Sequence, residues 1–171
     1  MIYLTKEHLA FIHIPKCGGT SVLNQIRKLP KYKWNIKYGT HSGCDIAEDF
    51  NNFIVQVRNP YERFLSAYHH QMYRGQNLSL HTILNYLKND NAHFFSDYGI
   101  LRRQCEWIDF KKTKIFKLEE GTIWTYLNDL GYDINEKHSK PQKRTISLTD
   151  EQKKIVYKYY KTDFERLGYN E

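Results

Sequence analysis

The sequence predicts an α/β fold, a three-layer α/β/α sandwich around a short, mostly parallel sheet. Three short segments, at residues 9–14, 53–57 and 114–118, are predicted to be strands, and the first two are mainly apolar. Stretches with helical spacing follow them, and an alternation of strands and helices is typical of a parallel sheet. No repeat or low-complexity tract interrupts the chain, so its 171 residues are expected to form a single domain, residues 1–171.

The first strand leads into a tight turn at residues 15–21, Pro-Lys-Cys-Gly-Gly-Thr-Ser. A helix is predicted next, because apolar residues recur at helical spacing up to Pro30: Val22, Leu23, Ile26 and Leu29. Gly18 and Gly19 allow the backbone to approach a ligand closely, and the first N–H groups of a helix lack intrahelical partners. The helix dipole favours negative charge at that end. Lys16 adds a positive charge, so the turn is predicted to bind an anion in a P-loop-like manner.

The order of residues in this turn differs from that of a Walker A motif. A Walker A motif places its lysine directly after the last glycine, whereas Lys16 precedes both glycines. The alternative to anion binding is a plain Gly-Gly turn in which Lys16 and Ser21 are merely solvated.

Composition narrows the class of protein and of partner. The chain is 40% hydrophobic and 26% charged, which is ordinary for a globular protein. Its formal net charge of +7 indicates an anionic partner, such as nucleic acid, an acidic glycan or a phosphorylated cofactor. No membrane span or signal peptide is predicted, so a cytoplasmic chain is expected unless the sequence is an excised catalytic domain. Cys17, Cys44 and Cys105 lie far apart, and neither a disulfide framework nor a metal site is expected.

The strand at residues 53–57 ends in a second informative junction, Arg58-Asn59-Pro60. Asn59 suits the N-cap and Pro60 the first position of a helix. An apolar stripe follows, made of Tyr61, Phe64, Leu65, Tyr68 and Met72. Other residues are expected on a different face: Arg63, Ser66 and His70. Arg58 stands at the carboxyl end of a predicted strand, where open α/β sheets bind ligands.

The remaining elements are predicted in the same way. They are a strand at 34–38, a loop at 39–44, a helical turn at 45–50, and helices at 81–87, 98–107 and 122–130. A basic loop at 135–146 precedes the last helix. Thr149 and Gln152 give that helix a capping-box pattern.

Taken together, the two junctions resemble those of the sulfotransferase superfamily, and most of all its carbohydrate branch, which includes heparan sulfate 2-O-sulfotransferase. Residues 11–22 are similar to the family's 5′-phosphosulfate loop, and residues 57–68 to its 3′-phosphate motif, R-(D/N)-P-x-E-R-x-x-S-x-Y. The motifs stand in this order, about 40 residues apart. Weaker similarity continues through residues 117–119, 148–149 and 159–169, so the resemblance covers most of the chain.

The resemblance implies a sulfuryl donor, 3′-phosphoadenosine 5′-phosphosulfate, a product, 3′,5′-bisphosphoadenosine, and no requirement for a metal. It implies that Lys16 contacts the oxygen that bridges phosphate and sulfate. The 5′-phosphate is expected on the loop residues Gly18, Gly19, Thr20 and Ser21, with Cys17 as a small residue of the same cofactor-binding loop. Arg58 and Ser66 are expected to hold the 3′-phosphate. The alternatives are an ion pair of Arg58 with Glu62 and an ordinary exposed position for Ser66.

Sulfuryl transfer also needs a base for the acceptor hydroxyl, and histidine has a suitable pKa. Among eight histidines, His41 lies in the loop between the two motifs. It is similar in place to the catalytic histidine of the 2-O-sulfotransferase branch, so His41 and Lys16 are the expected catalytic residues. His13 is expected to be structural. The resemblance also suggests that Lys143 and Arg144 cover the cofactor, the alternative being a solvated basic loop.

The expected acceptor is a hydroxyl group. A glycan is the acceptor that the resemblance favours, with a small metabolite and a protein tyrosine as alternatives, and residues 71–107 are expected to select it. Candidates there are Arg74, His81, Tyr98, Arg102 and Arg103. One alternative is a P-loop kinase of a small molecule, although GK[ST] and a Walker B aspartate are missing. Another is a non-catalytic domain that binds anions or nucleic acid, although no RNA-binding signature is present and no nucleic-acid partner is expected. The sequence does not indicate an oligomeric state.

Overall fold

The computed structural model describes residues 1–36, 43, 50–76, 78–91, 99–134 and 146–171. The chain divides into two compact units, which are described separately. The first unit contains Met1–Val57 and Glu106–Pro141, and the second contains Arg58–Cys105 and Gln142–Glu171. None of the helices in the described ranges combines the length and apolarity needed to cross a membrane.

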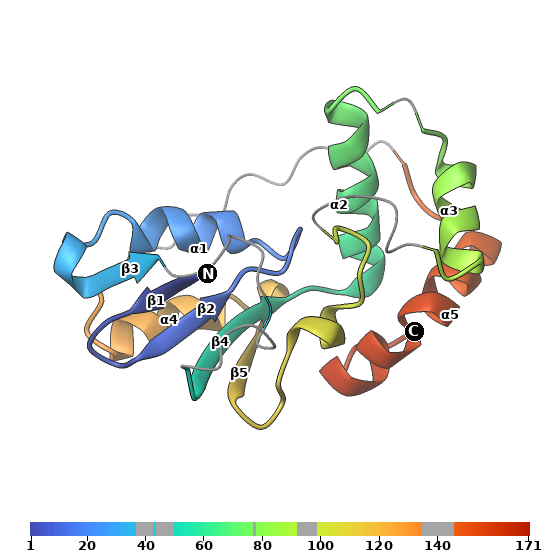
Figure 1. The fold of residues 1–171 in the computed structure, drawn as a ribbon. Coiled ribbons are helices and arrows are strands. Elements are labelled where there is room, and N and C mark those ends of the chain that lie inside the picture. The colour runs from blue at the N-terminus through green and yellow to red at the C-terminus, as the bar shows by residue number, and fades with distance from the viewer. Residues whose placement is uncertain (37–42, 44–49, 77, 92–98, 135–145) are drawn as a thin grey trace. The chain divides into compact units, whose positions relative to one another are not determined.

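The first unit is built on a five-stranded sheet with the order β3-β1-β2-β4-β5 (Figure 1). Its strands are β1 Ile2–Leu4, β2 Leu9–Ile12, β3 Trp34–Ile36, β4 Asn52–Val57 and β5 Thr113–Lys117. β2, β4 and β5 are parallel, whereas β1 is antiparallel to both β2 and β3. The predicted α/β class is confirmed, and the sheet is mixed.

β1 was not predicted from the sequence. Its apolar run is only three residues long, and a turn at residues 5–8 leads directly into β2. A connection this short joins antiparallel strands, because parallel strands need a crossover of a dozen residues or more. β1 therefore adds an antiparallel pair beside the parallel strands that the sequence predicts.

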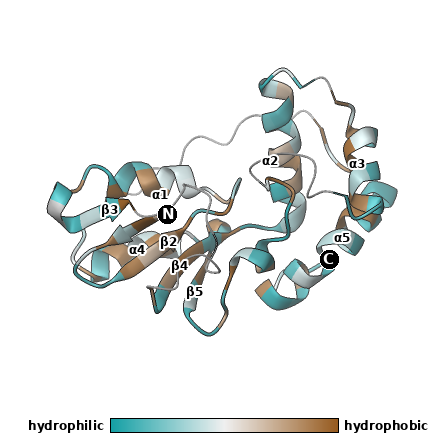
Figure 2. Cartoon of the chain, in the orientation of Figure 1, coloured by the Kyte–Doolittle hydropathy of each residue, from teal (hydrophilic) through white to brown (hydrophobic). Residues whose placement is uncertain are grey.

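A hydrophobic core joins one face of this sheet to α1 (Gly19–Ile26) and α4 (Thr122–Asp129). The strands contribute alternate residues, among them Ile2, Leu4, Leu9, Phe11, Ile54 and Phe116. The helices contribute Val22, Leu23, Ile26, Ile123, Trp124 and Leu127. Figure 2 shows hydrophobic residues along β2 and β4. Successive side chains of a strand point to opposite faces, so both helices cover the same face.

The second unit packs α2 (Pro60–Tyr73), α3 (Leu80–Lys88) and α5 (Asp150–Leu167) around its own core. That core includes Phe64, Leu65, Tyr68, Ile83, Leu84, Leu87, Val156, Tyr160 and Phe164. The predicted helix starts are confirmed. Asn59 Oδ1 accepts from the backbone N–H groups of Tyr61 and Glu62, and Thr149 and Gln152 form a capping box.

Two expectations for this region were wrong. Arg63 was expected on a polar face of α2, but its side chain is only 1% exposed and its Nη2 donates to Ile100 O at 3.0 Å. Residues 98–107 were expected to be helical, but the described part contains turns and a 3₁₀ helix at Gln104–Trp107. Gly99 has a φ of 57°, a left-handed conformation that interrupts a right-handed helix.

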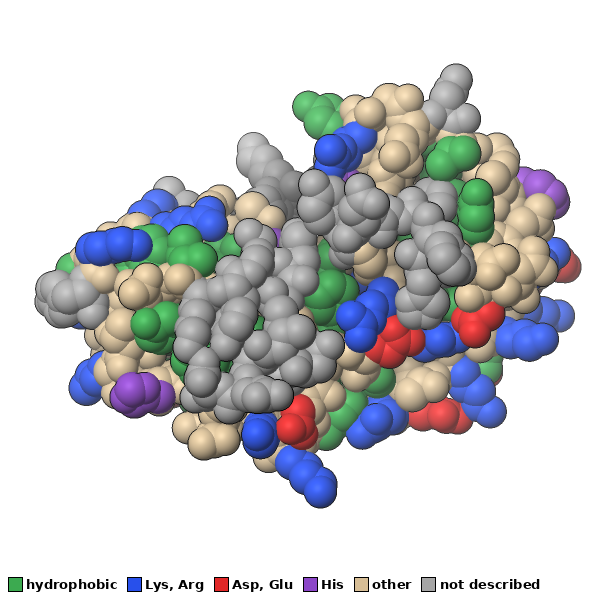
Figure 3. Space-filling view, viewed as in Figure 1, with side chains coloured by type: hydrophobic (Ala, Val, Ile, Leu, Met, Phe, Trp, Pro, Cys, Tyr) green, Lys and Arg blue, Asp and Glu red, His purple; other side chains and the backbone are tan. Residues whose placement is uncertain are grey.

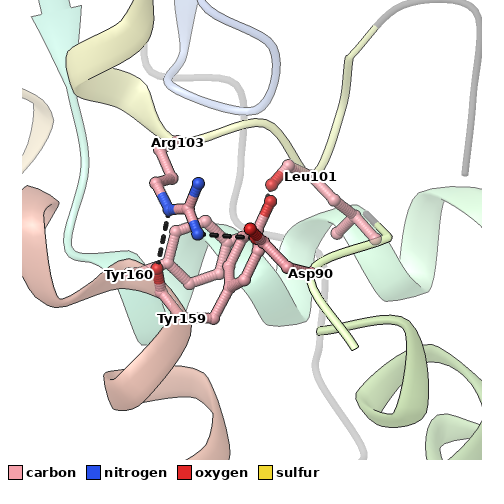
Figure 4. A network of polar contacts seen from close by, with 5 residues as sticks. All are labelled: Asp90, Leu101, Arg103, Tyr159 and Tyr160. Atoms are coloured by element: carbon pink, nitrogen blue, oxygen red, sulfur yellow. Dashed lines mark hydrogen bonds and ion pairs between the residues drawn. The ribbon is translucent and has the colours of Figure 1, made fainter. Parts of the chain in front are cut away.

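Arg103, a candidate for selecting the acceptor, is part of a network of polar and ring contacts with α5 (Figure 4). Its Nε donates to Tyr159 O at 2.9 Å, and its Nη2 lies 2.7 Å from Asp90 Oδ1. The guanidinium also stacks over the Tyr159 ring, 4.3 Å from the centroid. These contacts gather where α5 kinks, at the non-helical Tyr160. Arg103 therefore connects the segment before the Gln104–Trp107 3₁₀ helix to the kinked part of α5.

We predict that the stability of the second unit falls as the pH rises above about 10, and that Tyr160→Phe removes part of this fall. Burial raises the pKa of Tyr160, whose hydroxyl donates to Leu101 O at 2.8 Å. The phenol of the unfolded chain ionises at its ordinary pKa, while the folded one stays neutral. Its contribution to stability is thus complete below that value and declines above it. Urea unfolding at pH 8, 10 and 11 measures how the free energy of unfolding changes with pH.

The lost hydrogen bond of Tyr160→Phe lowers stability equally at every pH, so only the slope tests this prediction. Tyr73→Phe is the control, because Tyr73 is 82% exposed. An unchanged slope in Tyr160→Phe would contradict the assignment.

Candidate anion-binding site

The turn predicted to bind an anion lies between the end of β2 and the start of α1. Lys16 and Gly18 both have left-handed backbone conformations, with φ of 68° and 75°. Gly18 is the N-cap of α1, and the first turn of this helix contains no acidic residue. Gly18 O accepts from Ser21 N at 3.0 Å, while the N–H groups before Ser21 precede the helical hydrogen-bond ladder. The result is a positively polarised helix end beside a lysine.

The side chains of the loop differ in their accessibility. Thr20 is exposed, and Lys16 and Ser21 are half-buried, so an amine and two hydroxyls lie near the surface. Cys17 is fully buried, with its Sγ directed toward Pro15 O at 3.8 Å. Its side chain therefore fills the base of the turn, and its backbone N–H donates to Ile14 O at 3.4 Å.

His13 explains why a glycine stands at position 19. A Cβ placed on Gly19 would overlap the His13 ring and lie 2.7 Å from its Nε2. His13 is itself buried and stacks on Phe11, with ring centroids 6.4 Å apart. The expectation that His13 is structural agrees with this packing.

We predict that Gly19→Ala lowers the free energy of unfolding by about 1–3 kcal/mol, the usual cost of overpacking. The new methyl group would press on a ring that packing holds in place. Thermal unfolding of Gly19→Ala, His13→Ala and the double variant measures the coupling between the two sites. The substitution should cost much less in the His13→Ala background, and additive effects would contradict the steric explanation.

Gln56 is a polar residue near this loop that the sequence analysis did not single out. It is the penultimate residue of β4 and is only 1% exposed. Its Oε1 lies 3.0 Å from the position that a Cβ would take on Gly18. The signal was present in the sequence, as a glutamine within the apolar run Phe-Ile-Val-Gln-Val.

In the second unit, the backbone of Arg58 is fixed from both sides by one side chain. Gln104 Oε1 accepts from Arg58 N at 2.9 Å, and Gln104 Nε2 donates to Arg58 O at 2.8 Å. Asp163 holds Gln104 in turn, because its carboxyl group accepts from the N–H groups of Gln104 and Cys105 at 2.8 and 2.9 Å. Gln104 and Asp163 are both 0% exposed. Neither residue was predicted as part of a site.

The Arg58 side chain forms the ion pair with Glu62 that was the alternative to phosphate binding. Its Nη2 lies 3.5 Å from Glu62 Oε2, and the two side chains are 17% and 49% exposed. Such a partly solvated pair contributes little to stability. Ser66 is half-buried and follows Glu62 by one helical turn, so it lies on the same side of α2. Arg58, Glu62 and Ser66 thus share one end and one side of this helix.

Three predicted residues lie outside the described part of the chain: His41, Lys143 and Arg144. The same holds for Tyr98 and for residues 45–49 of the helical turn predicted at residues 45–50, while Phe50 is described and is not helical.

Basic side chains occur on several parts of the face shown in Figure 3. Some lie over the end of the first unit that holds α1 and β3, where Arg27, Lys28 and Lys31 are exposed, and others lie beside acidic side chains. On α5, lysines pair with carboxylates, Lys153 with Asp150 and Lys161 with Glu165. α5 is therefore not a uniformly basic helix of the kind that tracks a nucleic-acid backbone.

The first unit is an α/β fold in which a glycine-containing loop joins the end of β2 to the start of α1. Residues 1–113 match the model of the Sulfotransferase family, which amounts to 113 of 171 residues. The chain belongs to this family, whose members transfer a sulfuryl group to a hydroxyl-bearing acceptor. No curated protein and no solved structure matches the chain.

Proposed function

We propose that the protein transfers the sulfuryl group of 3′-phosphoadenosine 5′-phosphosulfate to a hydroxyl group of a carbohydrate, and that residues 1–171 act as one sulfotransferase domain. The observation that carries the proposal is the loop between β2 and α1 in a chain of the Sulfotransferase family. The carbohydrate acceptor rests on the similarity of both sequence motifs to the 2-O-sulfotransferase branch.

The residues of the first unit fit the 5′ end of this donor. Lys16 and Gly18 turn the backbone into a left-handed arrangement before α1, a geometry that directs successive N–H groups toward an anion. Thr20 and Ser21 can donate hydroxyl hydrogen bonds from the first turn. Lys16 provides the positive charge that stabilises negative charge on the departing phosphate oxygen.

The residues of the second unit fit a phosphate monoester. Arg58 presents a guanidinium, which binds phosphate oxygens in a bidentate way, and Ser66 adds a hydroxyl from the same side of α2. The bound 3′-phosphate would compete with Glu62 for the Arg58 guanidinium. Lys143 and Arg144 are proposed to cover the cofactor, on the basis of the sequence resemblance alone.

His41 is proposed as the base. In the reaction, the acceptor oxygen forms a bond to sulfur while the bond from sulfur to the phosphate oxygen breaks. His41 takes the proton of the acceptor hydroxyl, and Lys16 stabilises the phosphate that leaves. The acceptor oxygen, the sulfur and the departing phosphate oxygen must be in line, so the protein contributes mainly by positioning the reactants and stabilising charge.

A transfer assay with radiolabelled donor and a panel of desulfated glycans tests this function. The wild-type protein should label a glycan, while His41→Ala should lose labelling by about a hundredfold or more and still bind 3′,5′-bisphosphoadenosine. His8→Ala is the matched control. Phosphate transfer from ATP-magnesium by the wild-type protein would instead support a P-loop kinase, and donor binding without transfer to any acceptor would support a domain that only binds.

A further inference from the structure

We infer that Gln56 is an additional donor-binding residue, whose side-chain amide donates a hydrogen bond to an oxygen at the 5′ end of the bound donor. This inference rests on the proposed function. Neither sequence motif includes Gln56, because it precedes Arg58 by two positions and lies inside a strand.

The position of Gln56 in the sheet places its side chain beside the loop. Val55 of β4 is paired with Ile12, the last residue of β2, so Gln56 stands just past the end of that strand. Gln56 and Ile54 share a face, because side chains alternate along a strand, and Ile54 packs in the core that α1 covers. The amide accordingly lies 3.0 Å from the Cβ position of Gly18, the N-cap of α1.

The side-chain amide of Gln56 is buried without a hydrogen-bond partner in the described part of the chain. Neither Oε1 nor Nε2 has a hydrogen-bond partner among the described residues, although the side chain is only 1% exposed. Burying a polar group in this way is unfavourable, and an apolar side chain of the same size would pack there without that cost. Two other buried glutamines do form side-chain hydrogen bonds. Gln104 Oε1 accepts from Arg58 N, and Gln25 Oε1 accepts from Lys28 Nζ.

A bound anion supplies the missing partner. An amide Nε2 donates to a phosphate or sulfate oxygen, and a half-turn of the amide exchanges the positions of Nε2 and Oε1. Leu118 Cδ1 is the other close neighbour of the Gly18 Cβ position, at 2.7 Å, and Leu118 is only half-buried. A shift of this flexible side chain would widen the space beside Gly18, where the Gln56 amide also lies.

Gln56→Met separates a binding role from a packing role, because methionine has nearly the same shape and no donor. If Gln56 binds the donor, Gln56→Met should raise the melting temperature of the protein without ligand. It should also lower the affinity for 3′,5′-bisphosphoadenosine by about tenfold. Gln56→Glu should lower this affinity further, because the substitution places a carboxylate beside the 5′-phosphate. The affinity for adenosine 3′-phosphate, which has no 5′-phosphate, should be unchanged in Gln56→Met.

Calorimetric titration and thermal unfolding of the full chain distinguish the outcomes. A wild-type protein that does not bind 3′,5′-bisphosphoadenosine would overturn the proposed function and this inference with it. Wild-type binding with equal affinity in Gln56→Met would overturn the inference alone. A Gln56→Met variant that is less stable, or fails to fold, would show that Gln56 has a packing role and would also overturn it. A more stable variant with a selective loss of affinity for the 5′-phosphate is the predicted result.

Discussion

Lys16→Met is expected to reduce kcat for sulfuryl transfer by about 10²–10³-fold, the usual effect of removing a group that stabilises charge in the transition state. The proposed role of Lys16 is to stabilise the negative charge that grows on the departing phosphate oxygen. Binding of 3′,5′-bisphosphoadenosine should weaken much less, because the loop backbone remains. Methionine is similar in length to lysine, and both residues have the same backbone strain at a φ of 68°. The comparison therefore isolates the loss of charge.

Steady-state kinetics with saturating donor measures the effect of Lys16→Met. Lys31→Met is the control, because Lys31 is an exposed residue of the same unit, 3.6 Å from the Trp34 ring centroid. If Lys16→Met kept wild-type kcat, or raised KM alone, Lys16 would not act in the chemical step.

Asp163→Ala is expected to lower the free energy of unfolding by about 2–6 kcal/mol, the largest effect on stability that we predict, because each buried donor left without an acceptor costs about 1–3 kcal/mol. The substitution leaves two fully buried N–H groups, of Gln104 and Cys105, without their acceptor. It also releases the residue that fixes the Arg58 backbone from both sides. Variants that still fold should therefore bind 3′,5′-bisphosphoadenosine more weakly, while binding of AMP changes less.

Urea unfolding, combined with hydrogen exchange at the Gln104 and Cys105 amides, measures this effect. Glu165→Gln is the matched control on the same helix, since its exposed pair with Lys161 is 3.6 Å long and should contribute little. Wild-type protection of both amides in Asp163→Ala would contradict the role given to this carboxyl group.

The elements predicted well from the sequence were those with a strong local signal. α2 and α5 begin directly after Asn59 and Thr149, their capping residues, and β4 contains the predicted run at residues 53–57. These signals depend on neighbours within a few residues, so the sequence carries them completely. The loop before α1 belongs to the same class, because its glycines stand directly at a strand–helix junction.

The features that were missed depend on contacts between distant residues. β1 has too short a run to be recognised alone and is defined by its two neighbours in the sheet. Arg63 looks like a surface residue in a helical pattern, but Ile100 O, 37 residues away, accepts from it in the core. Asp163 lies on the apolar face of α5, between Tyr160 and Phe164, and that position was an unused signal.

The pairing of Gln104 with Arg58 spans 46 residues and has no local signature. A glutamine in a short polar stretch has many possible partners, and only the fold selects one. The same holds for Gln56, whose place beside Gly18 follows from the register of β2 and β4.

The proposed function requires the protein to bind an adenosine nucleotide through both a 5′-phosphate and a 3′-phosphate. Calorimetric titration with 3′,5′-bisphosphoadenosine, AMP and ATP-magnesium, for the wild type and Arg58→Ala, measures this requirement. We predict binding of the bisphosphate without metal, weaker binding of AMP, and a loss of about tenfold or more in Arg58→Ala for the bisphosphate alone. Preference for ATP-magnesium, or equal binding of AMP and the bisphosphate, would contradict the account.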